Sequence, residues 1–210
     1  MEAECFHFSV LLTRRIAMSD VVFREGAHVR LRPLEREDVP LMRRWLNDPE
    51  TTQYLLRAFP LMEKAEEAWF DALSGSTTDY VLGIVARESD ALIGTIGLHR
   101  IDWRNRTATT GTIIGEKEWR GKGQGTEAKM LLLDFAFNAL DLYAIQSRVM
   151  ATNGRSLRYG EKCGYQEVGR LPHWIRSQDG TRCDEVLLIV TQERWRPLWD
   201  AYRALRKLST

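Results

Sequence analysis

Apolar and polar positions recur with two different periods along the chain, and these periods predict an alternation of strands and helices. The two-residue period over Ala27–Leu34 predicts a strand. Apolar residues at helical spacing predict a helix that Asp38 caps and that runs to about Leu46, and a second helix over Leu61–Leu73. Segments rich in Val, Ile and Thr then predict successive strands at Tyr80–Arg87, Ala91–His99 and Thr107–Ile114.

The second half of the chain continues this alternation. A long apolar helix is expected from about Gly125 to Leu140, and a short helix over Ser156–Cys163. Strands are expected at Ala144–Ala151, Gln166–Arg170 and Cys183–Thr191. A terminal helix carries an apolar stripe formed by Trp195, Leu198, Trp199, Tyr202 and Leu205. We expect the stripe to pack on its own domain, and a contact in a homodimer is the alternative.

Length, charge and residue usage narrow the class of protein. The chain has 210 residues, the size of one ordinary domain. Its 30 Lys and Arg residues nearly balance 29 Asp and Glu residues, which argues against nucleic acid as the main partner. No apolar run approaches the roughly 20 residues that span a bilayer, so no membrane partner is expected. The 4 histidines are scattered and form no HExxH motif, so no metal is expected.

Cysteine usage and the first residues bear on location and domain limits. The 3 cysteines lack CxxC spacing, which favours a reducing compartment and predicts a cytoplasmic protein. No export signal is recognisable, and Met18-Ser19-Asp20 has the form of a natural start. We therefore expect a leader over residues 1–19, a single domain over 20–192 and an amphipathic helix over 193–210.

One segment, Trp119–Ala128, has the composition of an anion-binding loop. It places three glycines and two basic residues between a predicted strand and a predicted helix. Glycines let the backbone turn sharply and approach a ligand closely. The first N–H groups of the helix have no intrahelical partner, and the helix dipole adds positive potential there. The segment therefore predicts an anion site, with a pyrophosphate as the expected anion and the basic side chains at its rim.

Three phosphate-binding patterns compete for this loop. A Walker A loop that starts at Gly115 requires glycine where the chain has Arg120. A dinucleotide fingerprint passes through Gly123, Gly125 and Ala128, but the next predicted strand ends without the expected carboxylate. The third pattern, (R/Q)xxGx(G/A), is met by Arg120, Gly123 and Gly125.

With this third pattern the chain resembles the GNAT N-acetyltransferases, and within them the branch of ribosomal-protein and spermidine acetyltransferases. Asn153–Ser156 opens the short helix, and Glu161–Tyr165 is similar to the EKxGF ending of the family. Arg30–Leu34 is similar to the RLRPL opening of this branch. The resemblance covers about residues 27–192.

The resemblance implies a mixed α/β GNAT fold that uses acetyl-CoA as co-substrate. A central, mostly antiparallel sheet of about six to seven strands, flanked by helices, is expected to splay between its fourth and fifth strands. The pantetheine arm is expected in that gap, against the backbone of Ile113 and Ile114 and the side chain of Asn153, with Ser156 nearby. The pyrophosphate is expected on the amides of Arg120, Gly121, Lys122, Gly123, Gln124, Gly125 and Thr126.

The catalytic acid and base are less clearly marked in the sequence. The family pattern places a tyrosine acid where this chain has Gly160, and the adjacent Tyr159 is about 100° away around a helix. Tyr159 is the candidate acid, with packing as the alternative. Glu116 is the candidate base, and Glu118 is a second; each is otherwise a solvated loop carboxylate.

Isolated histidines are weaker candidates for the base. His99 and His173 are more simply explained as structural or surface residues. The lack of a dominant base favours an α-amine as acceptor. Deprotonating an amine of pKa about 8 at pH 7 costs roughly 1 kcal/mol, against nearly 5 kcal/mol for an amine of pKa about 10.4.

Three functions remain open at this point. The first is transfer of an acetyl group from acetyl-CoA to a primary amine on a protein N-terminus, a polyamine or another small molecule, by direct attack on the thioester. The second is a non-catalytic CoA-binding module, which Gly160 at the usual acid position keeps open. The third is a dinucleotide-binding domain, which the spacing of the loop disfavours.

Overall fold

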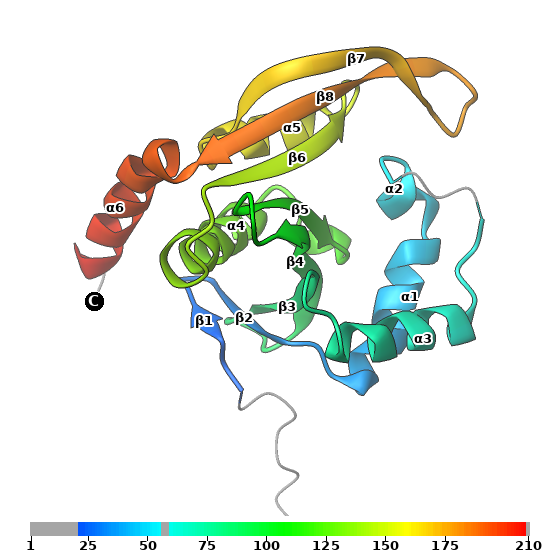
Figure 1. Cartoon of the computed structure of the whole chain (residues 1–210). Helices are drawn as coiled ribbons and strands as arrows, with labels where there is room; N and C mark the ends of the chain where they lie inside the picture. Colours follow the sequence, from blue (N-terminus) through cyan, green and yellow to red (C-terminus); the bar gives the residue numbers. More distant parts are fainter. Residues whose placement is uncertain (1–20, 56–58, 209–210) are drawn as a thin grey trace, which may run out of the picture.

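A single eight-stranded sheet organises the chain in the computed structural model, which describes residues 21–55 and 59–208 (Figure 1). The predicted leader over residues 1–19 and Cys5 lie outside the described residues. The strands follow the order β1-β2-β3-β4-β5-β6-β8-β7, and only β5 and β6 pair in parallel. Their bounds are β1 Arg24–Glu25, β2 Val29–Pro33, β3 Tyr80–Ala86, β4 Leu92–Asp102, β5 Thr107–Ile114, β6 Ala144–Met150, β7 Gln166–Arg176 and β8 Arg182–Thr191.

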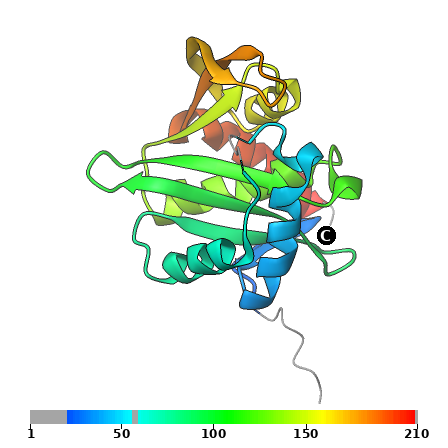
Figure 2. The same ribbon diagram turned by 90° about the vertical axis from the view of Figure 1, so that its right-hand side faces the viewer.

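Helices cover both faces of the sheet. Figure 2 shows α1 and α3 in front of the first strands and α4 behind them. On the α1 and α3 face, Met42 and Trp45 pack with Val85 and Leu92. On the opposite face, α4 contributes an unbroken buried run over residues 130–133 to the main core. The bounds are α1 Val39–Asn47, α2 Pro49–Thr52, α3 Glu63–Ser74, α4 Gln124–Asp134, α5 Gly154–Lys162 and α6 Gln192–Leu208.

The sheet divides between β5 and β6. The two strands pair only over three positions, from Thr107 with Ala144 to Thr109 with Gln146, and no pairing follows beyond them. The rest of β5 therefore has one edge without a strand partner, because its other edge pairs with β4 up to Ile114. The predicted fold class is confirmed, and the fourth and fifth predicted strands correspond to β5 and β6. The two-residue β1 adds a strand that the pattern did not predict.

Two local predictions differ from the structure. Asp38 precedes α1, but its carboxylate makes no cap on that helix. It accepts two hydrogen bonds from Arg32 at 2.6 and 2.9 Å and one from the backbone N–H of Glu35 at 2.8 Å. A buried guanidinium competes better for a carboxylate than a helix N–H group does. The predicted helix to Leu140 is α4 followed by a π-helical turn, Phe135–Ala139.

The β7–β8 hairpin is longer than predicted, since β7 continues to Arg176 through a register shift. It extends as an arm above the first half of the sheet (Figure 1). Near its tip, Gln178 Nε2 donates to the carbonyl of Thr52 in α2 at 3.2 Å. The tip of the arm therefore contacts the first half of the chain across the division in the sheet.

The terminal helix α6 carries its aromatic residues into the core. Trp195 and Trp199 are buried and stack at 5.4 Å, and Trp199 stacks on Tyr202 at 5.3 Å. Leu205 at the end of the stripe is exposed. The helix α6 therefore shares the core of the sheet. The division at residue 193 that the sequence suggested stays a prediction.

Neither a membrane span nor a metal cluster is present in the described part of the chain. None of its helices is long and apolar enough to cross a bilayer. Among residues 21–55 and 59–208, no three His, Cys, Asp or Glu side chains are grouped as metal ligands. Cys163 and Cys183 are buried and form no disulfide.

Candidate active site

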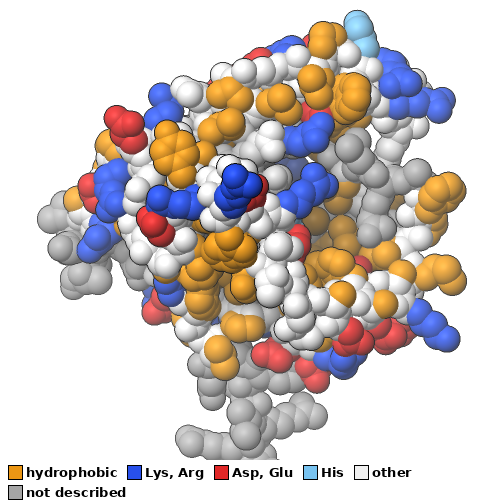
Figure 3. Space-filling model, viewed as in Figure 1, with side chains coloured by type: hydrophobic (Ala, Val, Ile, Leu, Met, Phe, Trp, Pro, Cys, Tyr) orange, Lys and Arg blue, Asp and Glu red, His pale blue; other side chains and the backbone are white. Residues whose placement is uncertain are grey.

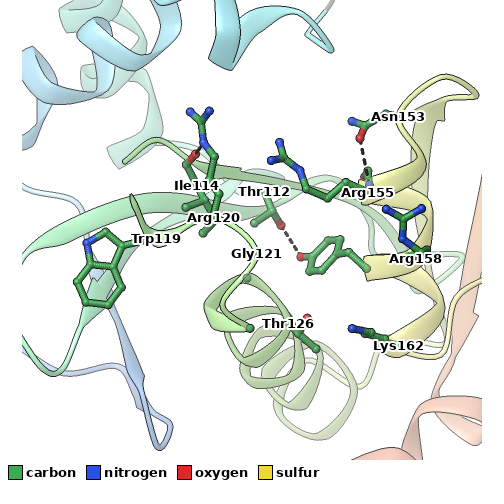
Figure 4. Close-up of a pocket in the computed structure, with 14 residues that line it drawn as sticks. Thr112, Ile114, Trp119, Arg120, Gly121, Thr126, Asn153, Arg155, Arg158 and Lys162 are labelled. Atoms are coloured by element: carbon green, nitrogen blue, oxygen red, sulfur yellow. Dashed lines mark hydrogen bonds between the residues drawn. The ribbon is translucent and has the colours of Figure 1, made fainter. Parts of the chain in front are cut away.

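A cleft of about 460 Å³ opens where β5 and β6 separate, between the N-terminus of α4 and the helix α5 (Figure 4). A second hollow of about 200 Å³ continues it between the two strands. The larger cleft is lined by Thr112, Ile114, Trp119, Arg120, Gly121, Gly123, Gly125, Thr126, Asn153, Arg155, Ser156, Arg158, Tyr159 and Lys162. The glycine loop and the Asn153 segment, which are far apart in the sequence, are therefore walls of one cleft.

Glycine is required at two positions of the loop. Gly121 and Gly123 have φ values of +78° and +96°, in the left-handed region that strains other residues. Gly123 is the N-cap of α4, so the first amides of that helix follow it directly. Gly125 has ordinary helical geometry, and a Cβ there would lie 3.7 Å from Ile114 and from Tyr159. Bare backbone at Gly125 thus keeps the cleft open.

Arg120 holds the loop in place. Its Nε donates to the carbonyl of Ile114 at 2.9 Å, and its Nη2 donates to the carbonyl of Gly115 at 3.0 Å. The same guanidinium binds Thr51 Oγ1 at 2.7 Å and Glu50 Oε1 at 2.9 Å, and the side chain is only 10% exposed. The charge of Arg120 thus fastens the loop to β5 and α2, and its predicted role at the rim of the anion site stays a prediction.

Asn153 begins α5 at the opposite wall. Its Oδ1 accepts a hydrogen bond from the backbone N–H of Ser156 at 3.0 Å, which caps the helix. Both residues line the cleft, as the sequence predicts. The cap commits the Asn153 oxygen to the helix and leaves its amide nitrogen as the group with which it could donate to a ligand.

Two tyrosines connect to the open part of β5. Tyr159 OH lies 3.0 Å from Thr112 Oγ1, and Tyr165 OH lies 2.9 Å from Thr110 Oγ1. Tyr159 lines the cleft, whereas Tyr165 is not among its lining residues. Burial raises the pKa of Tyr159 well above its ordinary value, with the nearby Cys163 adding to the effect and the Thr112 hydrogen bond opposing it. Its hydroxyl therefore stays protonated and can donate.

The comparisons with known proteins agree with this geometry. The family profile of the acetyltransferase (GNAT) domain matches residues 28–166. The chain belongs to the GNAT acetyltransferase family. It is similar to an uncharacterised N-acetyltransferase of Bacillus licheniformis, with 31% identity over 70% of this chain and 84% of that protein. It is also similar to the spermidine N(1)-acetyltransferase of Escherichia coli K12, with 30% identity over 70% of this chain and 78% of that protein.

Solved structures of the family share the fold. The spermidine N-acetyltransferase of Vibrio cholerae, solved in complex with CoA and spermine, superposes with a TM-score of 0.75. It covers 81% of this chain and 99% of its own, at 23% identity. As a member of this family, the chain is an N-acyltransferase that depends on acetyl-CoA.

Within this GNAT fold, the remaining predicted residues are placed as follows. Glu116 accepts a hydrogen bond from Trp45 Nε1 at 3.0 Å and pairs with Arg44, and it lines neither hollow of the cleft. Lys122 lies over the ring of Trp119, and Gln124 is buried at 8% exposure. The catalytic role of Glu116 stays a prediction, and its carboxylate is committed to α1.

The direction of backbone hydrogen bonding along β5 distinguishes Ile113 from Ile114, for which the sequence predicted the same role. Peptide groups of alternate residues point to opposite edges of a strand. Gly115 N–H donates to Ile93 in β4, so Ile113, two residues earlier, also directs its backbone toward β4. Thr112 and Ile114 then direct theirs to the open edge, where the Ile114 carbonyl already accepts from Arg120. Thr112, which the sequence did not suggest, faces the gap in place of Ile113.

The basic face of α5 was also missed. Arg155, Arg158 and Lys162 line the cleft from one side of the helix. Figure 3 shows Lys and Arg side chains gathered in the middle of the face that carries α4 and α5. The spacing i, i+3, i+7 of these three residues is visible in the sequence and could have identified them.

A buried lysine closes the floor of the gap. Lys129 of α4 is 2% exposed and lines the smaller hollow, with its Nζ 5.6 Å from the ring centre of Tyr159 and 5.7 Å from that of Tyr165. Burial lowers the pKa of Lys129 to about 7. The signal in the sequence was a single lysine inside an otherwise apolar helix.

Proposed function

We propose that the chain transfers the acetyl group of acetyl-CoA to a primary amine by direct attack of the amine on the thioester. The observation that carries this proposal is the open edge of β5, which lies between the glycine loop at one end and Tyr159 at the side. Such an edge can align an extended arm through backbone groups alone. No side chain of the protein needs to form a covalent bond for this chemistry.

The glycine loop suits the pyrophosphate of the co-substrate. The left-handed glycines Gly121 and Gly123 leave the amides at the start of α4 open to the cleft, and Arg120 fastens the loop. A helix N-terminus favours an anion through its N–H groups and its dipole. Arg155, which lines the same cleft, adds positive charge for the phosphates.

The open edge of β5 suits the pantetheine arm and the thioester carbonyl. Thr112 and Ile114 direct backbone groups to that edge, so their N–H groups can pair with the arm or polarise the carbonyl. Asn153 can donate to the arm from the opposite wall. We assign the polarising role to this edge and not to the backbone of Ile113.

Tyr159 suits the leaving thiolate. Although Tyr159 is one residue from the family position, it points into the cleft, whereas a Cβ at Gly160 would lie 3.2 Å from the core residue Leu188. Tyr159 thus supplies to the cleft the tyrosine that the family pattern has at residue 160. Because its hydroxyl stays protonated, it can donate a hydrogen bond to the sulfur as the carbon–sulfur bond breaks.

The Tyr159→Phe variant tests this role. We expect kcat to fall by about 100-fold with the Kd of acetyl-CoA little changed, since a positioned hydrogen-bond donor to the developing thiolate contributes about that much and binding does not need the hydroxyl. Tyr165→Phe is a matched control, because it removes an equivalent hydrogen bond to β5 outside the cleft. Equal kcat values for the two variants would remove Tyr159 from the proposed mechanism.

The co-substrate itself is tested by thermal unfolding. Acetyl-CoA at a hundredfold excess over its Kd should stabilise the folded state by about 2.7 kcal/mol, which for a chain of this size raises Tm by roughly 5–10 °C. NAD and ATP at the same concentration serve as controls for the competing loop patterns. A rise with NAD in place of acetyl-CoA would contradict the proposal. Binding of acetyl-CoA without turnover of any amine would favour the non-catalytic module.

A further inference from the structure

A second cavity lies on the other face of the sheet, beneath α1 and α3, with a volume of about 270 Å³. It is lined by Met42, Trp45, Leu46, Leu55, Glu66, Trp69, Val81, Thr95, Ile96, Gly97, His99, Gly111, Thr112 and Ile113. Leu55 and residues 111–113 line this cavity and also the hollow between β5 and β6. The two spaces therefore meet across the open part of β5.

The chemistry of this cavity suits a cationic amine. Among the described residues that line it, Glu66 carries the one carboxylate and is 2% exposed, and the walls include the indoles of Trp45 and Trp69. Aromatic faces attract an ammonium group. The remaining lining is mostly apolar, so the cavity has room for the body of the molecule that carries the amine.

His99 reaches this cavity from β4 because glycines leave room for its ring. A Cβ at Gly97 would lie 2.9 Å from His99 Nε2, and a Cβ at Gly111 would lie 3.5 Å from it. Nε2 thus lies over the backbone of two neighbouring strands, and Gly111 belongs to the segment shared with the gap. The imidazole edge therefore lies at the wall of the cavity that Gly97 and Gly111 form.

Asp79 fixes the tautomer of His99. The Nδ1 of the ring lies 3.2 Å from Asp79 Oδ1, and Asp79 Oδ2 accepts a hydrogen bond from Thr78 Oγ1 at 2.8 Å. Partial burial acts to raise the pKa of Asp79, but the hydrogen bonds from Thr78 and His99 outweigh it and lower the pKa below its ordinary value. An ionised Asp79 accepts from Nδ1–H, so the neutral ring has its lone pair on Nε2.

Two acidic residues belong to the described surroundings of the ring and its cavity. Among the described residues that line the cavity or bond to the ring, these are Asp79 and Glu66, and α1 contributes only apolar side chains and Trp45. Asp79 accepts from Nδ1–H and so holds the ring while Nε2 takes a proton. An imidazole held by a carboxylate at one nitrogen, with the other nitrogen facing a cavity, has the arrangement of a general base.

We propose that His99 is the base that takes the proton from the acceptor amine, with Asp79 as its positioning residue. The inference rests on the proposed function and adds to it the site of the acceptor. Nε2 takes one proton from the ammonium form of the acceptor, and the freed lone pair forms the bond to the thioester carbon. The carbon–sulfur bond breaks with its electron pair on sulfur, the thiolate takes a second amine proton, and the imidazolium releases its proton to solvent.

The His99→Asn variant tests this role, because the Asn amide can still donate to Asp79 but cannot accept the proton. The probes are spermidine and a short peptide with a free α-amine. We expect kcat/KM to fall by about 100-fold at pH 7 and the acidic limb of the wild-type pH profile to be lost. Asp79→Asn should cost about 10-fold, and the Kd of acetyl-CoA should stay within about twofold for both variants.

A second readout needs no turnover. The nitrogen shifts of the His99 ring should report the Nδ1–H tautomer in the wild-type protein and its loss in Asp79→Asn. His173→Asn is the control, since the backbone N–H of His173, and not its ring, donates the hydrogen bond to Asp184. An acidic limb retained by His99→Asn overturns the inference while the proposed function stands. Wild-type protein that binds acetyl-CoA and acetylates neither amine overturns both.

Discussion

The Gly123→Val variant is expected to bind acetyl-CoA at least about 100-fold more weakly than the wild-type protein. A branched side chain at φ +96° is strained by about 1–2 kcal/mol, and the loop relieves this strain by moving. Moving the loop withdraws the amides at the start of α4 from the anion. Hydrogen bonds to charged groups contribute about 1.5–3 kcal/mol each, so losing two amounts to roughly 3 kcal/mol, or about 100-fold in Kd.

Calorimetric titration measures this Kd, and thermal unfolding shows that the variant is folded. Gly75→Val is the matched control. Gly75 has φ −100°, and a Cβ there would have no neighbour within 4 Å. Its Kd should stay within about twofold of the wild-type value, as for other surface substitutions. An unchanged Kd in Gly123→Val would falsify the assignment of the loop as the pyrophosphate site.

The Glu127→Ala variant is expected to lose about 3–5 kcal/mol of folding stability, a large fraction of a typical total. Glu127 of α4 is 6% exposed and accepts backbone N–H groups of Ala27, His28 and Val29 at 2.5, 2.8 and 2.9 Å. It also accepts from the hydroxyl of Tyr202. One carboxylate therefore joins β2, α4 and α6, and its removal leaves several donors without an acceptor.

Denaturant unfolding measures this loss, which corresponds to a fall in Tm of roughly 10 °C for a chain of this length. The stability of Glu127→Gln should lie between those of the wild-type protein and Glu127→Ala, because glutamine keeps one acceptor oxygen but presents an amide to donors. Glu161→Ala on the exposed side of α5 is the control and should change stability by less than about 0.5 kcal/mol. A loss as small as that of the control would mean that water replaces the carboxylate.

The residues predicted for the cofactor side could be selected from the sequence because their chemistry is local. A glycine at positive φ, the amides that follow it and the asparagine that caps α5 lie within short segments, so their spacing in the sequence reports their geometry. Nine of the eleven predicted cofactor residues line one hollow or the other, and Lys122 and Gln124 do not. Of the two predicted isoleucines, Ile114 directs its backbone to the open edge of β5 and Ile113 does not, since a strand reverses its direction of hydrogen bonding at each residue.

The catalytic groups depend on packing that no short segment contains. Tyr159 enters the cleft because Gly160 packs against Leu188 of β8, which fixes the rotation of α5. His99 and Asp79 approach each other from β4 and from the residue before β3, and two glycines on neighbouring strands admit the ring. Neither the packing of Gly160 on Leu188 nor the contact of His99 with Asp79 follows from a spacing along the chain. The sequence therefore offered no reason to prefer His99 over the other isolated histidines as a base.

The sequence by itself determined the class of this protein, the order of its strands and helices, and the loop that suits a pyrophosphate. These depend on hydrophobic period, on glycine geometry and on a helix terminus, all of which act over a few residues. Only the tertiary structure decided which residues of β5 direct their backbone to its open edge, which side of α5 faces the cleft and which charges are buried. Those properties arise where segments distant along the chain pack together, as Glu127 with β2 and His99 with Asp79 do.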